Sequence, residues 1–138
     1  MSNTAHIFFH LVDDNDIDLA VNSKLLELSG ISKNITTYNG ATTFLDAIES
    51  KQDQFLAQKN IVLLDIMMPR INGFDCLDRL SAMPAELQSV IRVYMLSSSI
   101  DRKDIQRAES YALVEKVLEK PLDIYVLQNY LRNMDVGG

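Results

Sequence analysis

Two kinds of apolar spacing alternate along this chain. Short runs of apolar or β-prone residues predict strands, and they cover residues 7–12, 35–38, 60–64, 91–96 and 114–118. Segments with apolar residues at helical spacing follow each run, at residues 17–28, 41–50, 74–83, 102–111 and 122–133. The sequence therefore predicts five strands that alternate with five helices.

The first helical segment illustrates the pattern. Ile17, Val21, Leu25 and Leu28 recur at spacings of four and three, which is typical of the apolar stripe of an amphipathic helix. Gly30 follows and predicts the end of that helix. The polar segment 51–59 fits either an extension of the second helix or a surface loop.

Apolar runs without alternation indicate strands that are buried on both faces, and helical crossovers are what parallel strands require. We therefore expect an α/β protein with an open, doubly wound parallel sheet of five strands flanked by five helices. A chain of 138 residues suffices for one domain, which we expect to span residues 1–138 without a second domain.

Composition and charge narrow the function classes. Apolar residues make up 47% and charged residues 23% of the chain, as in ordinary globular proteins. A net charge of −6 argues against direct binding to nucleic acid. Cys76 is the only cysteine, so no internal disulfide can form, and a small apolar role on a helix suits it.

The N-terminal residues 1–6 lack the basic flank and long apolar core of a signal peptide. The longest apolar stretches are only as long as strands, so no membrane span is predicted. We expect a cytoplasmic protein.

Polar side chains follow four of the predicted strands. Asp13 and Asp14 come after the first strand, Asp65 after the third, Ser97 after the fourth and Lys120 after the fifth. Ligands of doubly wound sheets bind beyond the carboxyl ends of the strands, where the strand order reverses. These side chains are therefore candidates for one common site.

Three carboxylates at one site would repel one another unless a cation neutralised them. Mg²⁺ prefers oxygen ligands and commonly combines one or two carboxylates with phosphate oxygens. Lys120 could then neutralise a phosphate from the other side, and Ser97 could donate a hydrogen bond to it. The set suits phosphoryl transfer.

The order of four motifs makes this interpretation specific. The motifs are Asp13-Asp14-Asn15, Leu64-Asp65-Ile66-Met67-Met68-Pro69 with Asn72-Gly73-Phe74, Leu96-Ser97-Ser98, and Lys120-Pro121-Leu122. Over essentially its whole length the chain resembles the receiver domain of two-component response regulators. The resemblance implies a flavodoxin-like fold with strand order 2-1-3-4-5.

The resemblance also implies roles for the acidic residues. Asp65 would accept a phosphoryl group from a phosphohistidine. Asp14 and Asp65 would bind Mg²⁺ through their side chains, and Met67 would bind it through its backbone carbonyl. Asp13 would lie close by and contact the ion through a water molecule. The protein would be a signalling switch rather than an enzyme, because it catalyses only its own phosphorylation and slow dephosphorylation.

The other two motifs would serve the switch. Lys120 would contact the bound phosphoryl group, Ser97 would move toward it, and Pro121 would follow Lys120 in the cis linkage usual for the family. The chain departs from the family pattern at Val117, where receivers usually carry an aromatic residue. Valine is too small and too stiff to act as the same rotamer switch. The segment 113–116 also replaces a small Gly-Ala pair.

The partners implied by the resemblance are proteins. A sensor histidine kinase or a histidine phosphotransfer protein would dock on the first helix near Asn15, Asp16 and Leu19. An unidentified downstream protein would read the phosphorylated state, or the phosphoryl group would be relayed onward.

Three other interpretations of these residues remain open. Asp13 and Asp14 could merely open the helix that begins near Asp16. A haloacid-dehalogenase-like phosphatase would use Asp14 and Asp16 in an Asp-x-Asp motif, but Asp18 stands where that motif requires Thr or Val. A pseudo-receiver would bind proteins without being phosphorylated. His6 and His10 lack ligand partners in the sequence, and we expect them to be structural.

Overall fold

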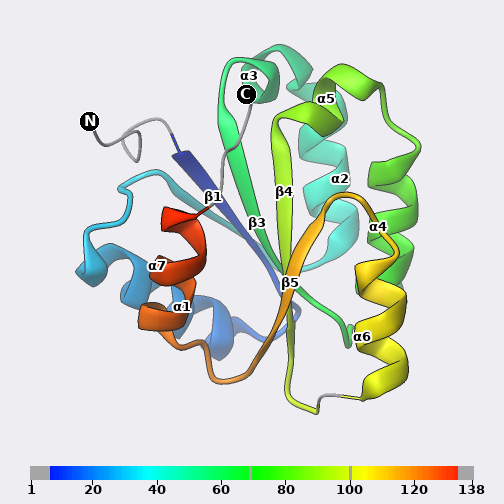
Figure 1. The fold of residues 1–138 in the computed structure, drawn as a ribbon. Helices are drawn as coiled ribbons and strands as arrows, with labels where there is room; N and C mark the ends of the chain where they lie inside the picture. Colours follow the sequence, from blue (N-terminus) through cyan, green and yellow to red (C-terminus); the bar gives the residue numbers. More distant parts are fainter. Residues whose placement is uncertain (1–6, 69, 100, 134–138) are drawn as a thin grey trace.

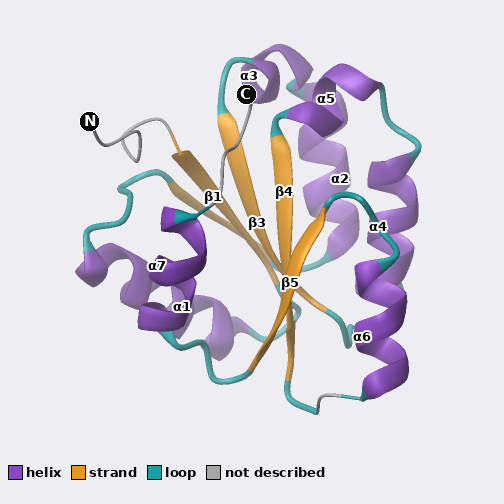
Figure 2. Ribbon diagram, in the orientation of Figure 1, coloured by secondary structure: helices purple, strands orange, loops and turns teal. Residues whose placement is uncertain are grey.

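The computed structural model describes residues 7–68, 70–99 and 101–133, and it contains one parallel sheet between two layers of helices (Figures 1 and 2). The strands are β1 (Ile7–Val12), β2 (Ile35–Tyr38), β3 (Lys59–Asp65), β4 (Ile91–Ser97) and β5 (Val114–Glu119). All are parallel and lie in the order β2-β1-β3-β4-β5. The predicted doubly wound fold and its strand order are confirmed.

The described part of the chain forms seven helices, two more than predicted. They are α1 (Asp16–Ser29), α2 (Ala41–Ser50), α3 (Gln52–Leu56), α4 (Gly73–Ser81), α5 (Ala85–Ser89), α6 (Arg102–Glu109) and α7 (Ile124–Arg132). The additional helices are short. Lys51 has φ −131° and separates α3 from α2, whereas Pro84 precedes α5. Segment 51–59 thus holds a separate helix, not an extension of α2.

The two faces of the sheet bury different apolar clusters. Helices α1 and α7 cover one face, where Phe9 and Leu63 lie in the core (Figure 1). The helices from α2 to α6 cover the other face, where Val62 and Leu64 lie with the buried Cys76. Successive residues of β3 therefore enter opposite cores, which is the physical reason for its continuous apolar run.

Helix α1 buries a different face from the one that its apolar spacing suggests. Ile17 and Leu28 are each 73% exposed, whereas Leu19, Asn22 and Leu26 are buried. The latter three residues also follow spacings of three and four, so two stripes compete on this helix. The helix ends as predicted, at Gly30 with φ 74°, a left-handed conformation that favours glycine.

The register of the sheet brings the functional motifs to one edge. Val12 lies opposite Leu64, Asp65 opposite Leu96, and Ser97 opposite Glu119. The carboxyl ends of β1, β3, β4 and β5 therefore meet at the same edge. None of the helices in the described residues is both long and apolar enough to cross a membrane.

Candidate functional site: an acidic cluster at the strand ends

Asp65 is the last residue of β3 and is 5% exposed. Its backbone is held close to the start of α4, where the Gly73 amide donates to the Ile66 carbonyl over 2.9 Å. A Cβ atom at Gly73 would lie 2.7 Å from the Asp65 carbonyl oxygen. Only glycine allows this close approach without displacement of the chain, so the loop after β3 fixes where Asp65 stands.

The acidic pair after β1 divides into a buried and an exposed residue. Asp13 is 3% exposed, and one of its carboxylate oxygens accepts from the Asn15 amide over 3.0 Å. Asn15 is the N-cap of α1, because its side chain accepts from the amides of Ile17 and Asp18. Asp14 is exposed. Since Asn15 caps the helix, opening α1 does not account for Asp13 and Asp14.

Lys120 reaches into the cluster from the end of β5. Its Nζ atom lies 3.0 Å from Asp13 Oδ2, 3.0 Å from Asp18 Oδ2 and 3.3 Å from Asp65 Oδ2. The Lys120 amide donates to the Ser97 carbonyl over 2.8 Å, and the peptide bond to Pro121 is cis, as predicted. One ammonium group therefore joins three carboxylates.

The cluster has the donor set that a hard cation requires. Asp13, Asp14 and Asp65 each offer a carboxylate oxygen, and these oxygens all lie within 4.8 Å of one another. Burial, together with the negative charge of Asp13, raises the pKa of Asp65 to about 6, although Lys120 acts in the opposite direction. The single ammonium thus leaves an excess of negative charge, and a divalent cation fits the site.

The pKa of Lys120 also reflects the excess of carboxylates over ammonium groups in the cluster. Burial alone lowers this pKa, but the hydrogen bonds to Asp18 and Asp13 and the charges of Asp65 and Asp13 outweigh burial and raise it. Lys120 therefore stays protonated in this environment.

Ser97 reaches the same edge of the sheet, but its hydroxyl is engaged elsewhere. The hydroxyl donates to the Ser99 carbonyl over 2.7 Å and accepts from the Ser99 amide over 3.2 Å. A serine hydroxyl has only one hydrogen to donate. Ser97 must therefore break its bond to the Ser99 carbonyl before it can donate to a group on Asp65.

Met67 and Val117 complete the set of residues singled out in the sequence. Met67 is 69% exposed, and its amide donates to Asp65 Oδ1 over 3.3 Å. Val117 lies opposite Met95 and packs, half-buried, against the core under α2 to α6. Its role in switching stays a prediction.

Asp18 is a member of the cluster that sequence reasoning missed. In the sequence Asp18 is notable only because it conflicts with a phosphatase motif. The available signal was its place in the first turn of α1, one helical turn after the acidic pair. Which carboxylate Lys120 would reach could not be derived from that spacing alone.

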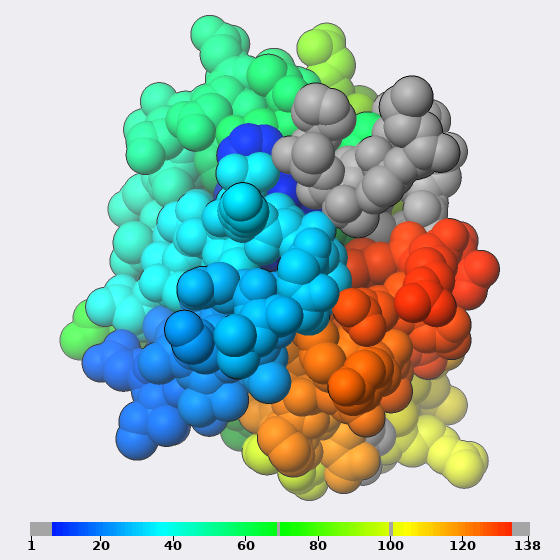
Figure 3. Space-filling model, turned by 90° about the vertical axis from the view of Figure 1, so that its left-hand side faces the viewer, coloured from blue at the N-terminus to red at the C-terminus, as the bar shows by residue number. Residues whose placement is uncertain are grey.

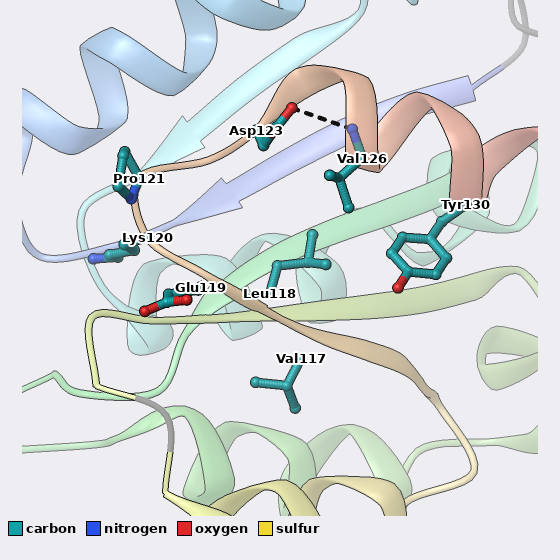
Figure 4. Close-up of a pocket in the computed structure, with 8 residues that line it drawn as sticks. All are labelled: Val117, Leu118, Glu119, Lys120, Pro121, Asp123, Val126 and Tyr130. Atoms are coloured by element: carbon teal, nitrogen blue, oxygen red, sulfur yellow. Dashed lines mark hydrogen bonds between the residues drawn. The ribbon is translucent and has the colours of Figure 1, made fainter.

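A hollow of about 570 Å³ lies beside the cluster, along β5 and α7 (Figure 4). Figure 4 shows that Lys120 extends beyond the strand end, on the side away from Tyr130. Among the residues that line the hollow, Lys120 is the one that also belongs to the carboxylate cluster.

His10 lies in a separate buried cluster. Its Nε2 atom is 2.9 Å from Asn60 Oδ1, and its Nδ1 atom is 3.0 Å from the Tyr38 hydroxyl. Burial lowers the pKa of His10 to about 4, although the bond to Asn60 acts in the opposite direction. This neutral, buried ring fits the structural role that we expected. His6 lies outside the described residues.

Comparison with known proteins identifies a family and a fold. The family model for the response regulator receiver domain matches residues 9–132. The sensory/regulatory proteins RpfC of two Xanthomonas campestris pv. campestris strains are 29% and 30% identical over 127 residues. Those residues are 92% of this chain but only 16% of each relative, so the chain spans about a sixth of the length of these curated relatives.

Several solved structures of other proteins are similar to the structure of this chain. A response regulator receiver protein from Dyadobacter fermentans is 33% identical, with a TM-score of 0.78 and coverage of 92% of this chain and 96% of that one. A two component response regulator from Cytophaga hutchinsonii has a TM-score of 0.84 at 24% identity, with coverage of 94% and 96%. The chemotaxis protein CheY4 of Vibrio cholerae has a TM-score of 0.75 at 18% identity and covers 94% and 98%. The last two structures are less than 25% identical to this chain and support the fold alone.

Proposed function

Because this chain belongs to the response regulator receiver domain family, whose members accept phosphoryl groups in two-component signalling, we propose that Asp65 is its phosphoryl acceptor. The donor is a phosphohistidine on a sensor histidine kinase or a histidine phosphotransfer protein. The observation that carries this proposal is the convergence of Asp65 with Asp13, Asp14 and Lys120 at the strand ends.

The reaction requires little covalent machinery from the protein. A carboxylate oxygen of Asp65 attacks phosphorus, the bond between phosphorus and the donor's imidazole nitrogen breaks, and that nitrogen keeps the electron pair. Lys120 stabilises charge on the phosphoryl oxygens, because its ammonium already lies 3.3 Å from an Asp65 oxygen. Positioning and charge neutralisation therefore supply most of the catalysis.

Asp14 and Asp65 would hold Mg²⁺ with their side chains and Met67 with its carbonyl, and Asp13 would contribute through water. When bound, the cation would supply positive charge to the carboxylate and phosphoryl oxygens. Asp13 and Asp65 are buried, so their charges act through a medium that screens them poorly. The excess of carboxylates over ammonium is what makes a cation necessary.

Signalling follows from the new dianionic group. It gives Ser97 a stronger acceptor than the Ser99 carbonyl, so the hydroxyl turns toward the phosphoryl group and the loop after β4 rearranges. A downstream protein reads this rearrangement, or the phosphoryl group is relayed onward. The chain then acts in the cytoplasm as a switch and not as an enzyme with a separate substrate.

The docking surface for the phosphohistidine partner is the exposed side of α1, which lies beside α7 on one face (Figure 3). Ile17 and Val21 are 73% and 49% exposed there, near Asn15 and Asp16. Leu19, which we had also expected at this surface, is buried in the core and is not available to a partner. The docking surface itself stays a prediction.

The test is intact mass spectrometry after incubation with acetyl phosphate and Mg²⁺. We expect one phosphoryl adduct on the wild type, none on Asp65→Asn, and an undiminished adduct on Asp46→Asn. Asp46 is an exposed carboxylate on α2 and serves as the matched control. A wild type without adduct, or an adduct that persists in Asp65→Asn, would overturn the proposal.

Beryllofluoride, an acyl phosphate mimic, separates this function from that of a pseudo-receiver. We expect it to bind the wild type only when Mg²⁺ is present. Absence of binding would favour a protein-binding module that works without phosphorylation.

A further inference from the structure

Lys120 is paired with carboxylates that differ in how far they are buried. Asp13, on the inner side, has a side chain that is 5% exposed, whereas the side chain of Asp18, on the rim, is 39% exposed. Each has an oxygen 3.0 Å from Nζ, closer than the 3.3 Å to Asp65. An ammonium has three hydrogens, so these three carboxylates can use all of them.

Asp18 differs from its neighbours because its carboxylate is not one of the three with converging oxygens. Asp13, Asp14 and Asp65 form that group within the described residues. A cation bound there would partly neutralise the charge of Asp13. The attraction between Asp13 and Lys120 would then be weaker. Asp18 would keep its full charge for the ammonium.

From this geometry we propose that Asp18 is a positioning residue that restrains Lys120 at the rim and competes with the phosphoryl group for its ammonium. The inference rests on the proposed function of Asp65. Asp18 limits how strongly Lys120 stabilises the phosphoryl group, because an ammonium that is paired with a carboxylate offers less charge to a second anion.

The first test is beryllofluoride affinity at saturating Mg²⁺, measured by ¹⁹F NMR. Asp18→Asn keeps the shape and one acceptor oxygen but removes the charge. We expect it to bind beryllofluoride roughly three- to tenfold more tightly than the wild type, since the lost pair is half-exposed and partly screened.

Asp46→Asn is the matched control. It removes the same charge from an exposed carboxylate on α2, away from the cluster and from the docking surface, and Asp46 has no ion pair among the described residues. We expect its beryllofluoride affinity to match that of the wild type. Equal affinities of the Asp18→Asn and Asp46→Asn variants would overturn the inference. A wild type that binds no beryllofluoride would instead overturn the proposed function.

A second test asks whether Asp18 acts through Lys120, and it requires no phosphoryl group. Urea midpoints are measured for Asp18→Asn in the wild-type background and in a Lys120→Gln background, without Mg²⁺. We expect the change in urea midpoint caused by Asp18→Asn to be more destabilising when Lys120 is present than in the Lys120→Gln background. Only when Lys120 is present does the substitution remove an ion pair. The same shift in both backgrounds would contradict a coupling between the two residues.

Discussion

The molecule contains two buried polar clusters that differ in charge balance. Around His10, Asn60 and Tyr38 every polar contact joins neutral groups, and the ring is held in its neutral form. Around Lys120, one ammonium faces the carboxylates of Asp13, Asp18 and Asp65. In the first cluster the polar groups satisfy one another and carry no charge, whereas the second cluster has excess negative charge. Unbalanced charge of this kind is typical of candidate ligand sites, whereas a balanced neutral cluster is typical of a structural role.

The neutral cluster should affect stability alone. Asn60 is 0% exposed, and its amide donates to the carbonyls of Phe55 and Val90 while its oxygen accepts from His10 and Gln58. Asn60→Ala leaves these buried partners unpaired, so we expect the free energy of unfolding to fall by about 3 kcal/mol.

Urea denaturation measures this loss, and labelling of the folded variant by acetyl phosphate should be unchanged. Gln58→Ala, which removes only one of the groups bonded to Asn60, is the milder control. A labelling rate that falls along with stability would break the separation between the two clusters.

The charged cluster should affect chemistry first. Lys120→Gln removes the cation nearest Asp65, and we expect acetyl phosphate labelling to slow by about a hundredfold, as when an oxyanion donor is lost. Rates follow from intact mass at timed intervals. Lys116→Gln removes an exposed lysine of the same strand and should label at the wild-type rate. Equal rates for the two variants would contradict the role of Lys120.

The two clusters should respond to pH with opposite signs in the absence of Mg²⁺. The pKa of His10 is lowered from 6.5 to about 4, so the unfolded chain binds the proton first and stability falls as pH drops below 6.5. The pKa of Asp65 is raised from 3.8 to about 6, so the folded chain binds the proton first and stability rises as pH drops through 6.

Variants separate these two contributions. When the pH falls from about 7 to about 5, we expect the titration of His10 to lower the free energy of unfolding by about 2 kcal/mol. Over the same interval we expect the titration of Asp65 to raise it by about 1 kcal/mol. Asp65→Asn should therefore lose more stability than the wild type over this interval, and His10→Gln should lose less. Urea midpoints at the two pH values measure the difference. Identical pH dependence in all three proteins would contradict the assignment.

The smallest effect is expected at Ser97. Because its hydroxyl bonds to Ser99 and not to Asp65, Ser97→Ala should slow labelling only about threefold, as for loss of one neutral hydrogen bond. The amide NMR shifts of the loop after β4 should no longer respond to beryllofluoride, whereas those of the exposed control Ser98→Ala should respond as in the wild type. A retained response in Ser97→Ala would exclude this hydroxyl as the switch.

Much of the fold could be predicted from the sequence because the strands have an unmistakable pattern. The continuous run from Asn60 to Leu64 required a strand buried on both faces, and the structure confirms it. Helix α1 shows the limit of such reasoning. Ile17 and Leu28 suggested one stripe, but Leu19 and Leu26 enter the core, and local spacing cannot decide between two stripes. The packing of the sheet makes that choice.

The site divides in the same way. That Asp13, Asp65 and Lys120 would meet followed from their places at the ends of parallel strands. Contacts that depend on side-chain rotamers did not follow, and two examples are the bond from Lys120 to Asp18 and that from Ser97 to Ser99. Both concern the residues that tune the site rather than those that define it.

The most direct measurement is the location of the phosphoryl group. The wild type is treated with acetyl phosphate and Mg²⁺, reduced with borohydride, which converts an aspartyl phosphate to homoserine, and sequenced by tandem mass spectrometry. We predict homoserine at position 65 and unmodified aspartate at positions 13, 14 and 18. Homoserine at any of those three positions, or none at position 65, would contradict the assignment of Asp65 as the acceptor.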